Sequence, residues 1–168
     1  IKNFGENTFA EMLATLAHLH FNGMKSLIID LRGNRGGYMH PSIQMANEFL
    51  DEDQLIVYTE GSKVKREDYR SNGLGSFKHL PLVVLVDEMS ASSSEIFAGA
   101  IQDNDRGTII GRRSFGKGLV QEPVNFTDGS GIRLTVSRFY TPSGRCIQKP
   151  YDKDYAYDIY ERYAHGEM

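Results

Sequence analysis

The sequence predicts an α/β fold with a mostly parallel central sheet, flanking helices and an antiparallel C-terminal part. Short apolar runs, three of them suited to buried strands, alternate with segments whose apolar residues recur at helical spacing. The last two strands are separated by Asp128-Gly-Ser-Gly, a turn sequence typical of an antiparallel hairpin. The 168 residues are enough for one domain with a sizeable core.

The first half of the chain predicts two helices, two strands and a polar excursion. Helices are expected over residues 7–23 and 41–50, and strands over residues 26–31 and 55–59. Residues 61–78 are polar and carry mixed charges. Such a segment is usually a solvated loop, although one of this length between strands could border a substrate groove.

The second half is organised around the valine-rich apolar run 82–86, which predicts a buried strand. The run is followed by a cluster of serines and then by a helical stripe of apolar residues at 96, 97, 100 and 101. Further strands are expected over residues 108–111, 119–121 and 131–140. Pro123 is expected to end the middle one, and alternating apolar residues predict one buried face for the last.

The serine cluster lies where a strand is expected to give way to a helix. It consists of Ser90, Ser92, Ser93 and Ser94. This junction suits a nucleophile, because the first amides of a helix are unpaired donors and favour developing negative charge. The pattern Ser92-Ser-Ser-Glu95 also fits a capping box. Taken alone it favours that structural interpretation, since capping serines far outnumber catalytic ones.

A lysine between two glycines, Gly116-Lys117-Gly118, supplies a candidate base. A desolvated lysine with a lowered pKa can take the proton of a serine hydroxyl, whereas the alternative is a solvated lysine in a turn. Residues 111–117 also match the start of the phosphate-binding pattern G-x-x-x-x-G-K. Gly118 stands where that pattern needs Ser or Thr, and a strand follows in place of a helix, so nucleotide binding is disfavoured.

The segment after the first predicted strand, Arg32-Gly-Asn-Arg-Gly-Gly37, is rich in glycine. It could be an ordinary turn or a nest of backbone amides that binds an oxyanion. The loop alone favours the turn, and the presence of Ser92 and Lys117 raises the weight of the second interpretation, because acyl transfer needs such donors.

Composition narrows the choice of function. The net charge of −3 gives the chain no general attraction for nucleic acid or anionic lipid, and no apolar stretch approaches the length of a membrane span. Cys146 is the only cysteine, so an intrachain disulfide is excluded, and the five histidines are scattered. A Cys/His mechanism and a metal site are therefore disfavoured, and no cofactor is expected.

Six blocks carry a family resemblance. They are residues 30–37, 86–96, 102–103, 115–121, 133–136 and 140–145. In this order and spacing they resemble the carboxy-terminal processing (tail-specific) proteases, the S41 serine peptidases, over roughly residues 26–148. The resemblance implies a Clp-protease/crotonase-like core for the α/β fold.

The resemblance also implies roles for individual residues. It implies a Ser/Lys dyad of Ser92 and Lys117, which are 25 positions apart as in the family. Gln121 would orient the lysine and Asp103 would support the site. The oxyanion hole would consist of the amide of Ser93 and one from Gly36 or Gly37. The family commonly has alanine after the nucleophile, so Ser93 is a departure that adds a second hydroxyl.

At the level of the whole chain, the resemblance implies a catalytic core at residues 1–148 and a tyrosine-rich tail at 149–168. A PDZ domain and an export signal, usual in the family, are expected to lie outside this sequence. The implied location is extracytoplasmic, in the bacterial periplasm or cell envelope. The implied substrates are unstructured proteins bound through their C-terminal segments, without nucleic acid or a lipid-embedded segment, and the oligomeric state stays open.

Two other functions remain open from the sequence. One is a catalytically inactive, peptide-binding relative in which Ser92 only caps its helix. The other is a crotonase-type enzyme acting on acyl thioesters, which also uses backbone oxyanion donors. The protease mechanism makes one further demand: Lys117 has to be mostly neutral, well below the ordinary lysine pKa of about 10.4, which requires burial or a nearby positive charge.

Overall fold

The computed structural model describes residues 1–150 and 163–165. Its first layer is a parallel sheet with the strand order β1-β4-β5, formed by β1 (Leu27–Asp30), β4 (Leu82–Val86) and β5 (Thr108–Gly111). The pairs Leu27–Leu82 and Val83–Thr108 fix the register. The parallel central sheet predicted from the apolar runs is therefore confirmed.

The second sheet is antiparallel and has the order β3-β2-β7-β6. Its strands are β2 (Leu55–Glu60), β3 (Glu67–Arg70), β6 (Leu119–Asn125) and β7 (Gly131–Tyr140). The antiparallel C-terminal part is thus confirmed, and the earlier strand β2 joins it.

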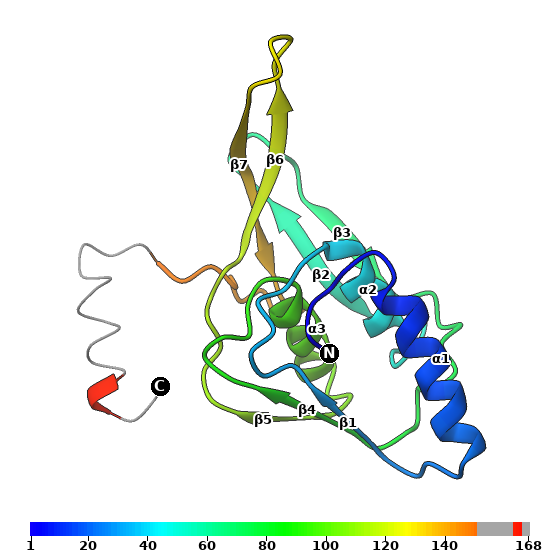
Figure 1. Cartoon of the computed structure of the whole chain (residues 1–168). Helices are drawn as coiled ribbons and strands as arrows, with labels where there is room; N and C mark the ends of the chain where they lie inside the picture. Colours follow the sequence, from blue (N-terminus) through cyan, green and yellow to red (C-terminus); the bar gives the residue numbers. More distant parts are fainter. Residues whose placement is uncertain (151–162, 166–168) are drawn as a thin grey trace.

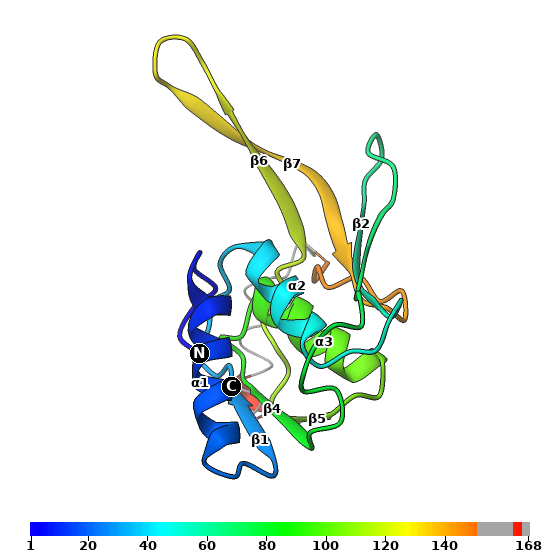
Figure 2. The ribbon, with the colours of Figure 1, turned by 90° about the vertical axis from the view of Figure 1, so that its right-hand side faces the viewer.

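Helices α2 (Met39–Asn47) and α3 (Ser93–Asp103) lie between the two sheets, and α1 (Thr8–Phe21) packs beside α2 (Figures 1 and 2). Helix α3 is buried from Ser93 to Ile101 because it contacts α2, β2 and β5 at once. Phe97 of α3 meets Phe49 edge to face at 6.1 Å in the centre of the core. Burial on every side makes α3 the most constrained element of the fold, and its N-terminus follows the serine cluster.

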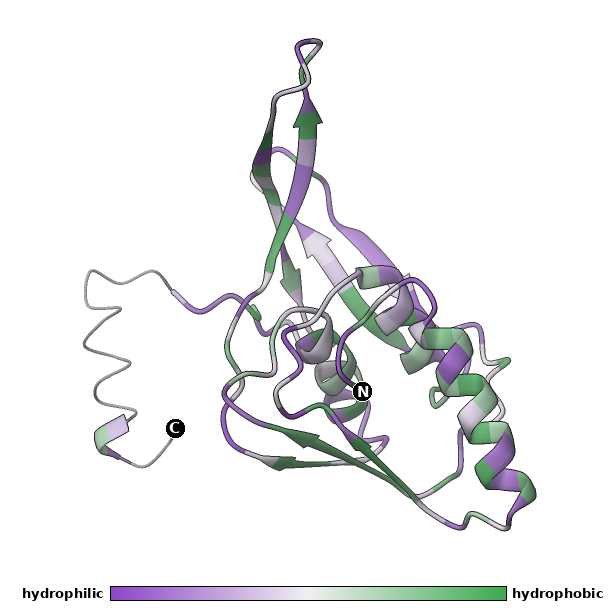
Figure 3. Ribbon diagram, in the orientation of Figure 1, coloured by the Kyte–Doolittle hydropathy of each residue, from purple (hydrophilic) through white to green (hydrophobic). Residues whose placement is uncertain are grey.

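The β6–β7 hairpin projects away from the body of the molecule (Figure 2). Its residues from Gln121 to Thr135 are exposed, whereas Ser137 and Phe139 at its base are buried. The expectation of one buried face along the whole of 131–140 is wrong for the outer half. The hairpin alternates between hydrophilic and hydrophobic residues, in contrast to the hydrophobic strands of the parallel sheet (Figure 3).

Two further expectations need correction. The polar excursion at 61–78 contains the strand β3, which the sequence did not indicate because its four residues are all polar or aromatic. Pro123 does not end a strand, since β6 continues to Asn125. Proline is tolerated there because β6 is an edge strand, where one side needs no ladder donors. The predicted tail at 149–168 lies outside the described residues except for 149, 150 and 163–165.

Candidate active site

The sheet topology brings two distant loops to one edge. Strands β1 and β4 are parallel neighbours, so the glycine-rich loop after β1 and the serine-rich loop after β4 emerge at the same carboxyl end. In open parallel sheets ligands bind at this edge. The sequence elements singled out above are thereby placed side by side.

Three of the four clustered serines join these two loops by hydrogen bonds. Their acceptors are main-chain carbonyl oxygens of the β1 loop: Leu31 for Ser90 at 2.8 Å, Asn34 for Ser94 at 2.9 Å, and both Gly37 and Tyr38 for Ser93 at 3.0 Å. All three serines are 0 or 1% exposed. Their hydroxyls are engaged in holding the loops together, and Ser92 is the member of the cluster that makes no such bond.

Ser92 stands at the N-terminal cap of α3 in a strained conformation. Its φ of 56° and ψ of −113° lie in a region that residues other than glycine rarely adopt. Such a backbone costs on the order of 1–3 kcal/mol, and it is retained chiefly at functional sites. Its side chain is half-buried, in contrast to its neighbours.

Glu95 links the serine loop to the lysine loop. Its Oε2 accepts hydrogen bonds from the amides of Ser92 and Lys117, both at 2.9 Å. Its Oε1 accepts bonds from the Ser114 hydroxyl and the Gly116 amide, both at 2.7 Å. The capping contact predicted for Glu95 is present, but the other three bonds were missed, because sequence shows the cap and not the loop that folds over it.

The environment of Glu95 is low in water. The residue is 7% exposed, and this burial raises the pKa of its carboxyl despite the four hydrogen bonds, which lower it. Because both amides bind the same oxygen atom, the backbone nitrogens of Ser92 and Lys117 lie within about 6 Å of each other. The backbones of the predicted nucleophile and base are thus neighbours, although 25 positions separate them.

The side chain of Lys117 is exposed and makes no hydrogen bond or ion pair within residues 1–150 and 163–165. Gln121 lies four positions later on β6, also exposed, and its amide nitrogen is 3.5 Å from the Thr135 hydroxyl.

Gly36 of the β1 loop approaches the serine loop closely, whereas its neighbour Gly37 lies against the backbone of Phe4. A Cβ at Gly36 would lie 2.6 Å from the Ala91 oxygen and 2.8 Å from Ser92 Cβ, so only glycine fits there. The Gly36 amide donates to Asn34 Oδ1 at 2.8 Å. In the described part of the chain the amides of Gly37 and Ser93 have no acceptor. The two loops that meet at this edge therefore each contain one amide without an acceptor among the described residues.

Asp103 is not brought to this edge. It ends α3, about 16 Å along the helix from Ser92 at 1.5 Å per residue. There it accepts hydrogen bonds from the amide and hydroxyl of Ser143 at 3.1 and 2.7 Å and forms an ion pair with Arg145. Burial by itself raises the pKa of Asp103, but bonds from Thr141, Ser143 and Arg145 outweigh it and lower the pKa.

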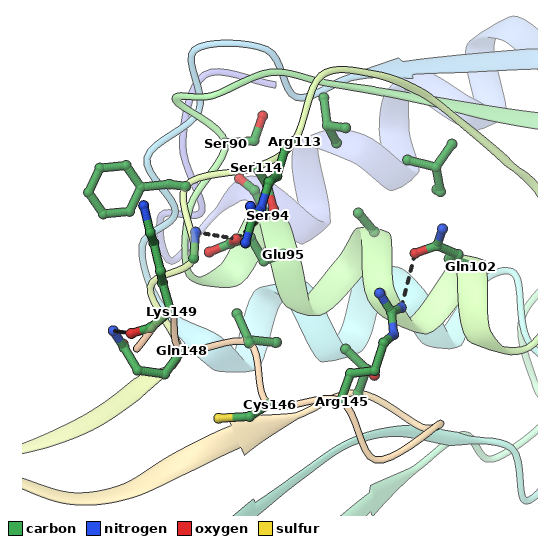
Figure 4. Close-up of a pocket in the computed structure, with 18 of the residues that line it drawn as sticks. Ser90, Ser94, Glu95, Gln102, Arg113, Ser114, Arg145, Cys146, Gln148 and Lys149 are labelled. Carbon is green, nitrogen blue, oxygen red and sulfur yellow. Dashed lines mark hydrogen bonds between the residues drawn. The ribbon is translucent and has the colours of Figure 1, made fainter. Parts of the chain in front are cut away.

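A cavity of about 420 Å³ lies on the other side of the lysine loop, between α3, residues 112–116 and residues 145–150. Glu95 reaches it from α3, and Arg145, Cys146 and Lys149 reach it from the segment 145–150 (Figure 4). Ser92 and Lys117 do not line it. The cavity therefore adjoins the site through Glu95 but is separate from the half-buried Ser92.

The described residues provide neither a metal site nor a membrane-spanning helix. Within residues 1–150 and 163–165, no three His, Cys, Asp or Glu side chains come close enough together to hold a metal ion. In the same part of the chain no helix combines the length and the apolar character that a membrane crossing requires.

A strained serine at a strand-to-helix junction, beside unpaired amide donors, is typical of hydrolases that act by acyl transfer. Comparison with known proteins agrees. Residues 1–157 match the model of peptidase family S41, and the chain belongs to that family. The parallel and curled antiparallel sheets are those of its solved structures.

Individual relatives make the similarity concrete. The chain is 40% identical over 149 residues to the carboxyl-terminal-processing protease of Synechocystis sp., and 38% identical to the chloroplastic C-terminal processing peptidase of Tetradesmus obliquus. These matches cover 89% of this chain and 34% and 32% of the two relatives. The chain thus spans about a third of the length of these relatives.

Among solved structures, the photosystem II D1 C-terminal processing protease superimposes with a TM-score of 0.82 and 38% identity. The match covers 88% of this chain and 38% of that one. Family and fold are therefore established by both sequence and structure.

Proposed function

We propose that this chain forms the catalytic centre of a serine endopeptidase in which Ser92 is the nucleophile and Lys117 the general base. One observation carries the proposal: a single oxygen of Glu95 binds the amides of both residues at 2.9 Å. That contact holds the two backbones together at the edge where the Ser93 and Gly37 amides have no acceptor among the residues that the structure describes.

The reaction follows from these groups. Neutral Lys117 Nζ takes the proton of Ser92 Oγ as the oxygen forms a bond to the peptide carbonyl carbon. The amides of Ser93 and Gly37 bind the resulting oxyanion. The lysine ammonium then gives its proton to the leaving nitrogen as the C–N bond breaks. Water, deprotonated by Lys117, then attacks the acyl carbon, and Lys117 returns the proton to Ser92 Oγ as the ester C–O bond breaks.

Gly37 suits the second oxyanion donor better than Gly36, because the Gly36 amide already donates to Asn34. Gln121 would orient Lys117 from the adjoining strand. Asp103 would support the site only indirectly, by anchoring residues 143 and 145 beyond the strand that pairs with β6.

The exposed position of Lys117 is consistent with a base that is completed by substrate. Strand β6 is the edge of its sheet, and an extended peptide could add to it by main-chain hydrogen bonds. A peptide lying there covers the lysine and removes it from water. Desolvation favours the neutral form of an amine, which is the form that the reaction needs.

The substrate class is inferred from the relatives. Both are named for processing at the carboxyl terminus, so we propose that this protein cleaves near the C-termini of unstructured proteins. By the same family likeness, residues 1–148 would be the catalytic core of an extracytoplasmic protein with a PDZ domain elsewhere in its chain. No metal or organic cofactor takes part in the proposed reaction.

The test is labelling with a fluorophosphonate probe between pH 6 and 10, followed by peptide mass mapping. The expected result is label on Ser92 that increases with pH and is lost in Lys117→Ala. Absence of label on folded protein purified from the full reading frame would overturn the proposal and favour an inactive peptide-binding relative. Turnover of an acyl thioester that survives Lys117→Ala would instead favour a crotonase-type enzyme.

A further inference from the structure

We infer that the hydroxyl of Ser93 is a positioning group that fixes the Gly37 amide as an oxyanion donor. The inference rests on the proposed function and concerns the residue at which this chain departs from the alanine common at that position. Ser93 would thus have two roles, because its own amide is the other proposed donor.

Gly37 needs external support. It follows Gly36, and the two have φ values of 93° and 148°, a region in which glycine moves freely. Neither residue has a side chain that could pack and hold the peptide in place. An oxyanion donor is effective only when its N–H direction is fixed before the reaction, so hydrogen bonds have to supply the rigidity.

The peptide group before Gly37 is held from one side. In this group the Phe4 amide donates to the Gly36 carbonyl at 3.0 Å; the Tyr38 amide, which donates to the Phe4 carbonyl at 2.7 Å, belongs to the peptide group after Gly37. In a trans peptide the N–H points away from the C=O. The bond to Phe4 therefore directs the Gly37 N–H away from the N-terminal segment.

The peptide group after Gly37 is held by Phe4 through its N–H and, from the other side, by Ser93 through its carbonyl. The hydroxyl lies 3.0 Å from the carbonyl oxygens of Gly37 and of Tyr38 and shares its single proton between them. Ser93 is 1% exposed, so water cannot replace this donor readily. Gly37 is thereby fixed relative to α3, whose first amide is the other proposed donor.

The serine cluster contains a matched control. Ser94 is equally buried, and its hydroxyl joins the same two loops by a bond to the Asn34 carbonyl at 2.9 Å. That bond lies three residues before Gly37 and leaves both peptide groups of Gly37 untouched. Ser93→Ala and Ser94→Ala therefore remove one buried hydroxyl each from one interface, and only the first loosens the proposed donor.

The experiment compares these variants with the parent protein, all purified from the full reading frame. The probes are fluorescein-labelled casein as an unstructured substrate and a pair of matched peptides ending in alaninal or alaninol. The aldehyde forms a hemiacetal with Ser92 whose oxygen occupies the oxyanion hole, and the alcohol does not. The ratio of their inhibition constants therefore reports the oxyanion hole separately from peptide binding.

For Ser93→Ala we expect kcat to fall about 10- to 100-fold with little change in KM, and the aldehyde to lose affinity by a similar factor while the alcohol does not. For Ser94→Ala we expect a lower unfolding temperature with kcat and the inhibitor ratio within about twofold. Equal inhibitor ratios in the two variants would overturn the inference.

The experiment distinguishes a failure of the inference about Ser93 from a failure of the proposed function. If Ser92→Ala retains casein cleavage and aldehyde binding, the proposed nucleophile is wrong, and with it the basis of the inference. If Ser92→Ala is inactive and Ser93→Ala behaves like the parent protein, only the role of the Ser93 hydroxyl is rejected.

Discussion

The two ends of helix α3 each carry a carboxylate that anchors a loop, and the pKa values of the two carboxylates are shifted in opposite directions. At the N-terminal end Glu95 accepts hydrogen bonds from Ser92 and the lysine loop, and burial raises its pKa. At the C-terminal end Asp103 binds Ser143 together with the cation Arg145, and its pKa is lowered. One end joins the two loops that carry the proposed catalytic residues, and the other includes an ion pair with Arg145.

Lys117 lies in the loop that Glu95 anchors, and its substitution should have the largest effect on activity. We expect Lys117→Ala to reduce the rate of casein cleavage by at least about 10³-fold, because the serine loses its base. The side chain is exposed and without a partner among the described residues, so the unfolding free energy should change by less than about 0.5 kcal/mol. Initial rates and urea unfolding measure the two quantities. A variant that keeps its activity would remove the lysine from the mechanism.

Glu95→Gln should affect activity and stability together. The amide keeps the shape of the carboxylate but offers one acceptor oxygen and an NH₂ group, so donors from Ser92 and Lys117 or from Ser114 and Gly116 lose their partner. We expect the unfolding free energy to fall by about 2–3 kcal/mol and kcat by about 10²-fold. Unchanged kcat in a destabilised variant would show that Glu95 serves the fold alone.

Asp103→Asn is the matched change at the other end of α3. It weakens the ion pair with Arg145 while the amide oxygen can still accept from Ser143. We expect a loss of about 1–2 kcal/mol in unfolding free energy and a decrease in kcat of less than about threefold. A larger kinetic effect than that of Glu95→Gln would reverse the assignment of the two ends.

The contributions of the two carboxylates to stability should change with pH in opposite directions. Asp103 has a lowered pKa in the folded state, so its stabilisation is present above the unfolded pKa and is lost as the pH falls through the folded value. Glu95 has a raised pKa, so its linked stability is greatest below the unfolded pKa and decreases as the pH rises through the folded value.

Urea unfolding between pH 3 and 8 measures both effects. The stability deficit of Asp103→Asn should shrink as the pH falls below about 4, the ordinary aspartate range. The deficit of Glu95→Gln should shrink as the pH rises above about 4.3, the ordinary glutamate value. Deficits that change in the same direction would contradict the difference between the two ends.

The sequence predicted most of the fold because the periodicity of its segments is strong. The run 82–86, the helical stripe after the serines and the turn at Asp128 all correspond to observed elements. The strand β3 was missed because Glu67–Arg70 has no apolar alternation and is held by pairing with β2. Tertiary pairing of this kind leaves no local pattern.

The candidate site was predictable in part. Ser92, Lys117 and the glycine loop stand out by residue type, and the topology brings their loops together. Sequence could not distinguish Ser92 from its neighbours by contacts, because the bonds of Ser90, Ser93 and Ser94 cross to a loop more than fifty positions earlier. It also could not show that Asp103 binds residues near the C-terminal end of α3, since those bonds depend on the fold of residues 143–145.

The bonds that unite the two loops join residues 55 to 60 positions apart, across a parallel sheet. Pairing over such separations costs chain entropy and forms slowly, after local helices and hairpins. A nascent or partly folded chain therefore has the serine and the glycine loop but not their alignment. The chemistry of this edge begins only when the whole domain has folded, which protects the unfinished chain from its own site.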